Sequence, residues 1–356
     1  MAFNSKLRSL RKCSSFQFPG TVCSVGANIA HTPIFAREIL GILKPKGGQV
    51  FVDATHGTGG HTRLILDKQK HARVFAFDID DKSIELGKEL GKTYNKDSFN
   101  AYVSRFSDLP KHFNKLGINE NILDGFLIDC GVSDLQLNDH SKGFSAKGPI
   151  DLRMDPQRLH YLKTGIEILK TVSHAELLRL LIDYGNLNEN AHLVTDTILN
   201  TRHMFNHTFI AEILYEILLD SVKFSKERKC LFLTMEKAYE WESKRTTFLL
   251  ESTITALRIF INDEINQLNL VLRIASHYLK PGGFLIVIVK NEVEEYALQK
   301  TLIELGLNKC NNSFPKDLKT YGMKKMTEKP YELGIMDKIL HPRVKNAKMF
   351  TISKVG

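Results

Sequence analysis

A glycine-rich segment at the end of an apolar run constrains the fold of this chain more than any other feature. The segment Asp53–Thr62 reads DATHGTGGHT; it begins within the strand-like run Gln49–Thr55 and leads into a helix-like run from about His61. Glycine lets a backbone turn tightly and approach a ligand that any Cβ atom would strike. A tight turn from strand to helix favours the first βα unit of a doubly wound α/β sheet.

Strand-like and helix-like segments alternate along the first 140 residues and return near the C-terminus. The alternation predicts βαβ units and therefore a mostly parallel sheet. A helix is expected to begin at Asp81, directly after the second strand. The expected strands are Gln49–Thr55, Ala72–Asp80, Asn100–Phe106, Ile122–Val132, Phe284–Val289 and Met349–Ser353.

Residues 141–250 contain no strong strand and mix helical periodicity with polar turns, so we interpret them as an inserted, mostly helical subdomain. The clearest helical pattern of the chain follows. Apolar residues recur at steps of three or four from Ile254 to Leu279, and Lys280–Gly283 then ends the pattern. The predicted division is a leader of residues 1–31, one domain made of residues 32–140 and 251–356, and the insertion of residues 141–250.

The net charge of +9 is concentrated at the two ends of the chain. Residues 1–37 contribute +5 and residues 315–356 contribute +6, so the middle carries −2 by difference. Residues 1–31 contain Arg, Lys and Ser but no acid and no long apolar core, which is typical of an organelle transit peptide; a disordered basic leader would have the same composition. The basic C-terminal stretch would suit contact with RNA phosphates, or it would be a solvated tail.

Composition and spacing disfavour several other classes of protein. No run of about 18 apolar residues occurs, so the sequence predicts no membrane-spanning helix and no membrane partner. Neither Gly-Lys-Ser nor Gly-Lys-Thr follows the glycines, so the turn is not an ATP-binding P-loop. The five cysteines include no C-x-x-C pair, and the sequence therefore supports neither a metal site nor a disulfide framework.

Two acids end strands that are expected to lie beside the glycine-rich turn. Asp78 ends the second expected strand and Asp129 ends the fourth. The carboxyl ends of parallel strands meet at one crevice of a doubly wound sheet, where nucleotides bind, and an acid there can accept both hydroxyls of a ribose. The dinucleotide fingerprint requires a third glycine where this chain has Thr62. The spacing alone leaves NAD and S-adenosylmethionine both open.

Several segments together resemble one family of enzymes. They are Asp53–Thr62, Asp129–Leu137 (DCGVSDLQL), Gly143–Ser145, Gly148–Asp155 (GPIDLRMD), Ala256–Ile259 and Pro281–Gly283. In this combination they are similar to the MraW/RsmH family of bacterial small-subunit rRNA (cytosine-N4)-methyltransferases, which has mitochondrial relatives in animals. The likeness extends from about His31 to the segment His341–Arg343, and GPIDLRMD is its most specific part.

The resemblance implies a fold, a cofactor and a reaction. The expected fold is α/β, a Rossmann-like class I methyltransferase sheet with an inserted helical subdomain, and the expected cofactor is S-adenosyl-L-methionine. The expected substrate is a cytidine of small-subunit ribosomal RNA, free or within an assembling small ribosomal subunit. The expected compartment is the mitochondrion, or the cytoplasm if the leader carries no targeting signal. The insertion would serve substrate recognition or the formation of a homodimer.

Residue by residue, the resemblance implies a cofactor site of Gly59, Gly60, His61, Asp78, Phe106, Asp129 and Gln136. The Gly59–His61 backbone would face the methionine end of the cofactor, Asp78 would hold the ribose hydroxyls, and Phe106 would pack on adenine. Asp129 and Gln136 would lie near the sulfonium and the base. Asp129 is the catalytic candidate, because a carboxylate can accept hydrogen bonds from the target amino group and fix its geometry.

Two further residues each have two interpretations. The target base must leave its stack to reach the pocket, and Phe144 would then either hold the face of the base or lie in the protein core. Arg153 would either contact an RNA phosphate or pair with the neighbouring acids Asp151 and Asp155.

Three segments depart from the family pattern. The chain has Val289–Glu295 (VKNEVEE) where the family has SFHSLED, Glu251–Ala256 (ESTITA) where it has TRTFQA, and Tyr184–Leu187 (YGNL) where it has YGEE. We expect these departures to lie outside the cofactor crevice and to affect RNA recognition and turnover. They favour a second hypothesis, a non-catalytic rRNA-binding ribosome-assembly factor that keeps the fold. An NAD-dependent oxidoreductase is the third.

Overall fold

The computed structural model describes residues 33–158, 160–205, 209–224, 235–305, 322–327 and 329–355. Residues 33–356 form one compact unit. The leader predicted for residues 1–31 lies outside the described residues, so its proposed targeting role stays a prediction. Among the helices that can be described, none combines the length and the apolar character needed to cross a membrane.

The strands of the described residues form one mixed sheet with the order β3-β2-β1-β4-β5-β8-β6, and β7 also pairs with β8. Strands β1 to β5 run parallel to their neighbours, whereas β8 runs antiparallel to β5 and to β6. This arrangement confirms the predicted doubly wound α/β class. The bounds are β1 Val50–Asp53, β2 Arg73–Asp78, β3 Phe99–Val103, β4 Leu123–Asp129, β5 Leu279–Val289, β6 Met323–Lys325, β7 Tyr331–Glu332 and β8 Lys348–Lys354.

Both faces of the sheet are buried, because the apolar side chains alternate between two cores along each central strand. Val50 and Val52 of β1 join one core with α5, α13 and α14, whereas Phe51 joins the other core with α2, α3 and α4. The same alternation separates Phe126 from Leu127 in β4. Burial on both faces explains why these strands appear in the sequence as continuous apolar runs.

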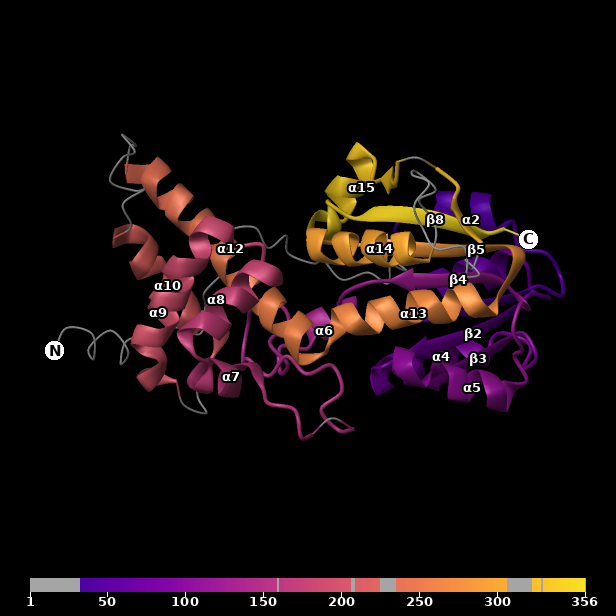
Figure 1. Ribbon diagram of the computed structural model, residues 1–356, viewed down its shortest axis with the longest axis horizontal. Helices are drawn as coiled ribbons and strands as arrows, with labels where there is room; N and C mark the ends of the chain where they lie inside the picture. Colours follow the sequence, from indigo (N-terminus) through magenta and orange to yellow (C-terminus); the bar gives the residue numbers. More distant parts are fainter. Residues whose placement is uncertain are drawn as a thin grey trace. The chain divides into compact units, whose positions relative to one another are not determined.

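The helices next to the sheet follow the strands in the expected alternation, and Figure 1 shows α4 and α5 beside β2 and β3. The helix after the second strand begins at Asp81, as predicted, and Asp80 caps it by accepting the N–H of Lys82. The bounds are α2 Ala36–Leu43, α3 Gly60–Lys68, α4 Asp81–Gly91, η1 Phe106–Asp108, α5 Leu109–Leu116, α6 Asp134–Asn138, α13 Glu264–Tyr278, α14 Glu292–Glu304, α15 Ile335–Leu340 and η4 Pro342–Val344.

A group of helices occupies most of the predicted insertion. Helix α12 packs against α8 and α10, and α9 packs against α8 and α10, an arrangement that can be followed in Figure 1. Helix α12 continues past residue 250, so the predicted end of the insertion falls inside a helix. The bounds are α7 Gly165–Thr171, α8 His174–Asp183, η2 Asn188–Asn190, α9 Ala191–Thr201, η3 Arg202–Met204, α10 Ala211–Phe224 and α12 Met235–Ile261.

The helix predicted from Ile254 to Leu279 is interrupted. Helix α12 ends at Ile261 and α13 begins at Glu264, because Asp263 between them has a φ of 55° in the left-handed region. Helix α13 ends at Tyr278, and the next residue already belongs to β5. The segment Lys280–Gly283, which was expected to end the helix, therefore lies in the first part of a strand.

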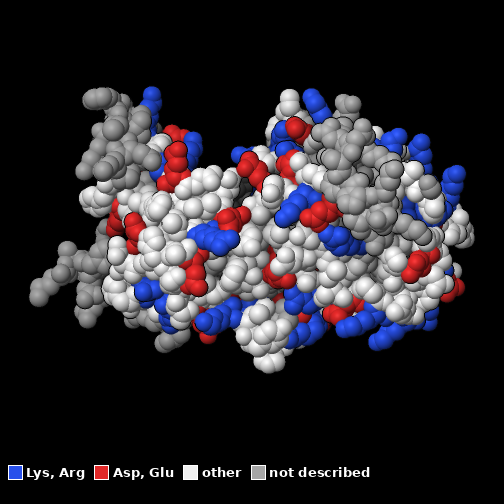
Figure 2. Space-filling model, viewed as in Figure 1, with Lys and Arg blue, Asp and Glu red and all other residues white. Residues whose placement is uncertain are grey.

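The basic C-terminal stretch is not a solvated tail where it can be described. Strand β8 lies inside the sheet between β5 and β6, with Phe350 and Ile352 buried in one of the two cores. Figure 2 shows positive and negative side chains over the visible face, with Lys and Arg gathered near the C-terminal end of the chain. The strand order therefore places the basic residues of β6 and β8 in two adjacent strands, of which β6 forms the edge of the sheet.

Candidate functional site

The carboxyl ends of β2, β1 and β4 meet where the order of the strands reverses. Strand β1 lies between β2 and β4, and the chain runs outward through β2 and β3 before it crosses to β4. Asp78 and Asp129 end β2 and β4, as the sequence predicts, and the glycine-rich turn follows β1. A doubly wound sheet binds its ligand at such a switch point. We call the turn of residues 53–62 together with Asp78 and Asp129 the switch-point site.

The glycine-rich turn is closed by backbone hydrogen bonds and by the side chain of Asp78. The N–H of His56 donates to the carbonyl of Phe77 (2.9 Å), and the N–H of Gly57 donates to Asp78 Oδ2 (2.7 Å). Gly57 and Gly59 have φ values of 54° and 81°, in the left-handed region. A Cβ atom on Gly59 would stand 3.0 Å from the His56 ring. Any other residue at this position would therefore be strained by that contact and by the left-handed φ.

Beneath the turn, three buried side chains form a hydrogen-bonded chain that the sequence analysis did not identify. The Thr62 hydroxyl donates to Asp53 Oδ2 (2.7 Å) and lies 3.1 Å from His56 Nδ1. Because the hydroxyl proton is used for Asp53, His56 Nδ1 must carry a hydrogen and act as the donor. Burial lowers the pKa of His56 despite the opposing charge of Asp53, so we assign the ring as neutral. The three side chains support the turn from below.

The carboxylate of Asp78 is held at both oxygens by the backbone. Oδ2 accepts the N–H of Gly57, and Oδ1 accepts the N–H of Asp80 at 2.9 Å. Burial raises the pKa of Asp78 to about 6, although the two backbone hydrogen bonds act in the opposite direction. Each oxygen has further lone pairs, so an oriented carboxylate at this position can accept two adjacent hydroxyl groups. The geometry fits the predicted ribose contact, which itself stays a prediction.

Asp129 forms an ion pair that the sequence analysis did not anticipate. Its Oδ1 lies 3.0 Å from Lys290 Nζ, and the two side chains are 22% and 20% exposed. The backbone N–H of Asp129 donates to the Thr55 hydroxyl (2.7 Å), which ties the end of β4 to the glycine-rich turn. The catalytic candidate is therefore fixed at its backbone and at one of its two carboxylate oxygens.

Behind Asp129 lies a buried group of charged side chains. Arg258 of α12 donates from Nε to Glu264 Oε1 (2.8 Å) and from Nη2 to Glu264 Oε2 (3.1 Å). The same Nη2 lies 3.8 Å from Glu294 Oε1, and Glu294 Oε2 accepts the N–H of Lys290 (2.7 Å). A bidentate arginine–carboxylate pair has a fixed geometry, so this group can position the chain that carries Lys290.

The position of Lys290 shows that one sequence expectation was wrong. The divergent segment Val289–Glu295 was expected to lie outside the crevice, but Lys290 contacts Asp129 directly. The physical reason is the strand order. Strands β4 and β5 are parallel neighbours with Asp129 paired to Ile288, so the residues that follow β5 reach the same edge of the sheet as Asp129. A parallel pairing of these strands was the signal that could have placed the segment at the site.

Gly60 and His61 begin α3 and pack against the first residues that the structure describes. A Cβ atom on Gly60 would stand 3.3 Å from Pro33 Cβ. The His61 ring is 7% exposed, and its Nε2 lies 3.1 Å from the carbonyl oxygen of Ile34. The His61 side chain therefore holds the segment before α2 against α3, while the predicted role of the Gly59–His61 backbone toward a cofactor is untested.

Gln136 and Phe106 are engaged in local structure near the same edge of the sheet. Gln136 is 4% exposed, and its Oε1 accepts the N–H of Ser133 (3.0 Å) in the capping box that begins α6. Phe106 begins η1 shortly after β3 and packs, partly buried, against the core of α5, α13 and α14. The contacts of both residues with a cofactor stay predictions.

Residues 139–158, which we call the strap, contain the GPIDLRMD run and contact the rim of the switch-point site. Gly143 and Gly148 have φ values of 80° and 74°, and a Cβ atom on them would stand 2.1 Å and 2.3 Å from backbone carbonyl oxygens. Only glycine fits at these two positions. Lys142 Nζ lies 3.6 Å from Asp80 Oδ2, and Lys82 Nζ lies 2.7 Å from Asp139 Oδ2.

Two side chains anchor the strap, one from a distant helix end and one from its own last residue, and neither was identified from the sequence. Asn262, 3% exposed at the α12–α13 break, donates to the carbonyl of Leu152 and accepts the N–H of Met154, both at 2.8 Å. Arg158 Nη1 lies 3.0 Å from Asp81 Oδ1 and its Nη2 donates to the carbonyl of residue 79 at 2.9 Å. No local pattern distinguishes either residue, because each anchors a segment far from it in the sequence.

The two open interpretations of strap residues are now resolved. Phe144 is 7% exposed, so it lies in the core and presents no open face to a base. Arg153 pairs with Asp151 through Nε (2.7 Å) and Nη2 (2.8 Å), whereas Asp155 pairs with Arg158 instead. The internal ion pair of Arg153 therefore accounts for its charge.

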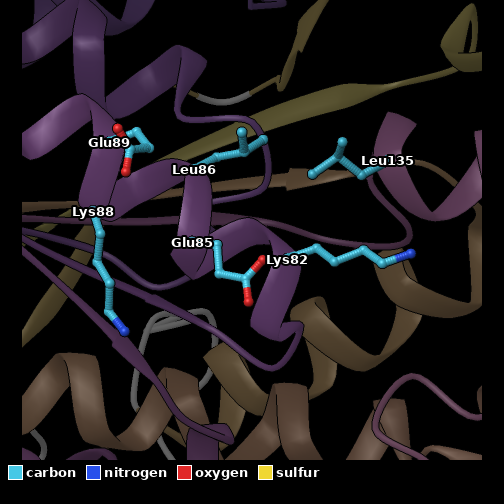
Figure 3. A pocket seen from close by; sticks show the side chains of 6 residues that line it. All are labelled: Lys82, Glu85, Leu86, Lys88, Glu89 and Leu135. Carbon is cyan, nitrogen blue, oxygen red and sulfur yellow. The ribbon is translucent and has the colours of Figure 1, made fainter.

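A depression of about 570 Å³ lies between α4 and α6 (Figure 3). Leu86 and Leu135 point toward each other across it from the two helices. Its lining residues are Lys82, Glu85, Leu86, Lys88, Glu89 and Leu135. None of the predicted cofactor residues lines this depression, so it is distinct from the switch-point site.

The chain is similar to several known proteins. The model of the MraW methylase family matches residues 28–355. A similar protein from Bos taurus is named 12S rRNA N(4)-cytidine methyltransferase METTL15, and it is 30% identical over 287 residues, which is 79% of this chain and 67% of that protein. The ribosomal RNA small subunit methyltransferase H of Carboxydothermus hydrogenoformans is 31% identical over 309 residues, which is 85% of this chain and 90% of that protein.

A third similar protein has an unrelated name. The putative receptor-type tyrosine-protein phosphatase mosPTP-1 of Culex quinquefasciatus is 30% identical over 289 residues, which is 81% of this chain. The match spans only 19% of the length of that protein. Its name therefore describes a much longer chain than the matched part.

Proposed function

The chain belongs to the MraW methylase family, and from this membership we propose that it is an S-adenosylmethionine-dependent methyltransferase acting on N4 of a cytidine in small-subunit ribosomal RNA. The names of the bovine and bacterial relatives support this reaction. Neither an NAD-dependent oxidoreductase nor a non-catalytic assembly factor is supported by the family or by these relatives.

One observation carries the proposal. The glycine-rich turn, Asp78 and Asp129 meet at the switch point of a doubly wound sheet. The two acids have different surroundings there, because Asp78 is oriented by two backbone N–H groups and Asp129 is paired with Lys290. From this difference we assign the oriented carboxylate of Asp78 to cofactor binding and the carboxylate of Asp129 to the target base.

The residues of the site fit S-adenosylmethionine. Asp78 would hold the ribose hydroxyls through its oriented carboxylate. Gly57 and Gly59 present backbone without side chains at left-handed φ, which permits close approach of a ligand. When bound, the cofactor supplies a methyl group on a positively charged sulfur. Gly60, His61, Phe106 and Gln136 complete the proposed cofactor site on the family resemblance.

Asp129 would act on the amino group that receives the methyl. The lone pair of cytosine N4 is delocalised into the ring, so the amino group is a weak nucleophile and must be well oriented. Asp129 Oδ2 would accept one N–H of this group, which fixes its direction and stabilises positive charge as the N–C bond forms and the methyl–sulfur bond breaks. The nitrogen then returns to neutrality by releasing one proton, which passes to Asp129 or to water.

We further propose that the substrate is the ribosomal RNA of an organelle small subunit, free or during subunit assembly. The bovine relative is named for 12S rRNA, and the acid-free basic composition of residues 1–31 suits mitochondrial import. Residues 141–250 would recognise this RNA rather than form a homodimer. The strap supports this assignment, because its Gly148 N–H donates to Glu212 of α10 and its Arg158 pairs with Asp81 at the rim of the switch-point site.

The experiment uses the full chain with S-adenosylmethionine labelled in its methyl group. Small ribosomal subunits from cells that lack the protein serve as the acceptor, and the RNA is digested and read for N4-methylcytidine by mass spectrometry. We expect label in that nucleoside with the native chain and none with Asp129→Ala. Absence of label with the native chain, at a concentration where calorimetry detects cofactor binding, would contradict the reaction; absence of cofactor binding would contradict the cofactor as well.

A further inference from the structure

Lys290 lies beside the proposed catalytic carboxylate in a segment where the chain departs from its family pattern. It directly follows β5, whose neighbour β4 ends at Asp129. Lys290 Nζ stands 3.0 Å from Asp129 Oδ1, and about four fifths of each side chain is buried. The family pattern has phenylalanine at this position of its SFHSLED segment, so the family motif does not supply this contact.

The lysine side chain is held along its length. A Cβ atom on Gly131, which has a φ of 92°, would stand 3.3 Å from Lys290 Cδ, so the glycine leaves room for the aliphatic stem. The backbone N–H of Lys290 donates to Glu294 Oε2 (2.7 Å), and Glu294 is itself 2% exposed. An ion pair between two fixed partners loses little side-chain entropy when it forms, unlike a pair of mobile surface chains.

The ammonium group stays charged in this surrounding. Burial lowers the pKa of Lys290, but the nearby carboxylate of Asp129 outweighs burial and the pKa is raised overall. Oδ1 of Asp129 therefore faces a positively charged ammonium group at 3.0 Å. Among the described residues, no hydrogen bond or ion pair is made by the other oxygen, Oδ2.

We propose that Lys290 is a positioning residue for methyl transfer, which holds Asp129 Oδ1 so that Asp129 Oδ2 is directed at the target amino group. This inference rests on the proposed function. Lys290 touches neither substrate nor cofactor in this role and acts through Asp129 alone. A carboxylate free to rotate would accept the amino hydrogen in several orientations, of which only some align the nitrogen lone pair with the methyl group.

The test compares three variants of the full chain. Lys290→Met keeps the length of the stem and removes the charge, and Lys290→Arg keeps the charge. Lys348→Met is the matched control, since Lys348 Nζ makes an ion pair of similar length with Glu295 Oε2 (2.8 Å) rather than with Asp129. The measurements are kcat and KM for small subunits at saturating S-adenosylmethionine, the cofactor Kd by calorimetry, and the Tm.

We expect Lys290→Met to lower kcat roughly 10- to 100-fold, the cost of a misplaced reacting group, while the cofactor Kd changes by less than about threefold. Lys290→Arg should recover most of the lost kcat, and Lys348→Met should match the native chain. Native kcat in Lys290→Met would overturn the inference, as would equal losses in the methionine and arginine variants. If Lys290→Met does not fold, the arginine variant decides: kcat within about fivefold of native supports the role, and a larger loss at native Tm overturns it. No methylation by the native chain would instead refute the proposed function.

Discussion

The two sides of the switch-point site are built in different ways. On one side, the turn of residues 53–62 is held by its own side chains, by Asp78 at the end of β2, and by the N–H of Asp129 at the end of β4. On the other side, the strap of residues 139–158 is held by Asn262, which is 108 positions from Met154, and by Arg158, which reaches Asp81 across 77 positions. The turn is therefore fixed by its own residues and by the ends of the two adjacent strands. The strap instead depends on contacts with helices that are distant in the sequence.

The largest loss of stability is expected when the buried anchor of the strap is removed. Asn262→Leu removes the side-chain partner of both the Leu152 carbonyl and the Met154 N–H, two groups on buried residues. We expect the free energy of unfolding to fall by about 3 kcal/mol, since each unsatisfied buried polar group costs about 1–3 kcal/mol. Urea denaturation measures the loss, and hydrogen exchange at the Met154 amide should accelerate.

The control for Asn262 is a neighbouring asparagine of similar chemistry. Asn266 is exposed and donates to Asp263 Oδ1, so Asn266→Leu should change the free energy of unfolding by less than about 0.5 kcal/mol. Equal losses in the two variants would mean that the helix, not the strap, determines the effect.

The next test removes one hydroxyl under the turn. Thr62→Val is nearly isosteric, but it leaves the fully buried Asp53 carboxylate with the N–H of Thr55 at 3.2 Å as its remaining described partner. We expect a loss of about 2 kcal/mol in the free energy of unfolding, and weaker binding of S-adenosylmethionine because the turn loosens. Thr253→Val in α12 is the control, because its hydroxyl donates to the Leu249 carbonyl within the helix; there the loss should stay near ~0.5 kcal/mol. If Thr62→Val binds the cofactor with the native Kd, the hydrogen bonds among Asp53, Thr62 and His56 do not contribute to cofactor binding.

A pH series sharpens the assignment of Asp78 on the turn side. Burial raises its pKa to about 6, so the carboxylate is ionised at pH 8 and becomes protonated as the pH falls below 6. A protonated carboxyl loses acceptor capacity, and we expect the Kd of S-adenosylmethionine to rise about tenfold per pH unit below pH 6. Calorimetry between pH 5 and 8 measures this. Asp78→Asn should bind weakly at pH 8 without this additional rise, and a native chain with constant affinity over the range would contradict the assignment.

The same contrast between local and distant contacts decides what could be predicted from the sequence. The strands and the turn at Asp53–Thr62 could be predicted, because apolar runs and glycines determine the conformation of the backbone where they occur. The break between α12 and α13 could not be predicted, because the apolar spacing continues across it. Asn262 at the break forms hydrogen bonds with strap residues more than 100 positions away. The same holds for Lys290, which became a site residue only when the pairing of β4 with β5 was known.

The smallest effect is expected at the exposed anchor of the strap. Arg158 forms an exposed ion pair with Asp81, which solvent screens, and a second pair with Asp155, whose side chain is 1% exposed. The backbone N–H of residue 158 also donates to Asp155 Oδ1 and remains in Arg158→Met, so the free energy of unfolding should fall by about 1 kcal/mol, below the effect of Asn262→Leu. Its main effect should be kinetic, because Arg158 also donates to the carbonyl of Ile79, the residue that follows Asp78. We expect faster release of S-adenosylmethionine in stopped-flow measurements, with Arg179→Met, which breaks an exposed pair in α8, unchanged. An Arg158 variant as unstable as Asn262→Leu would show that the strap has no weak anchor and that its two attachments form one cooperative unit.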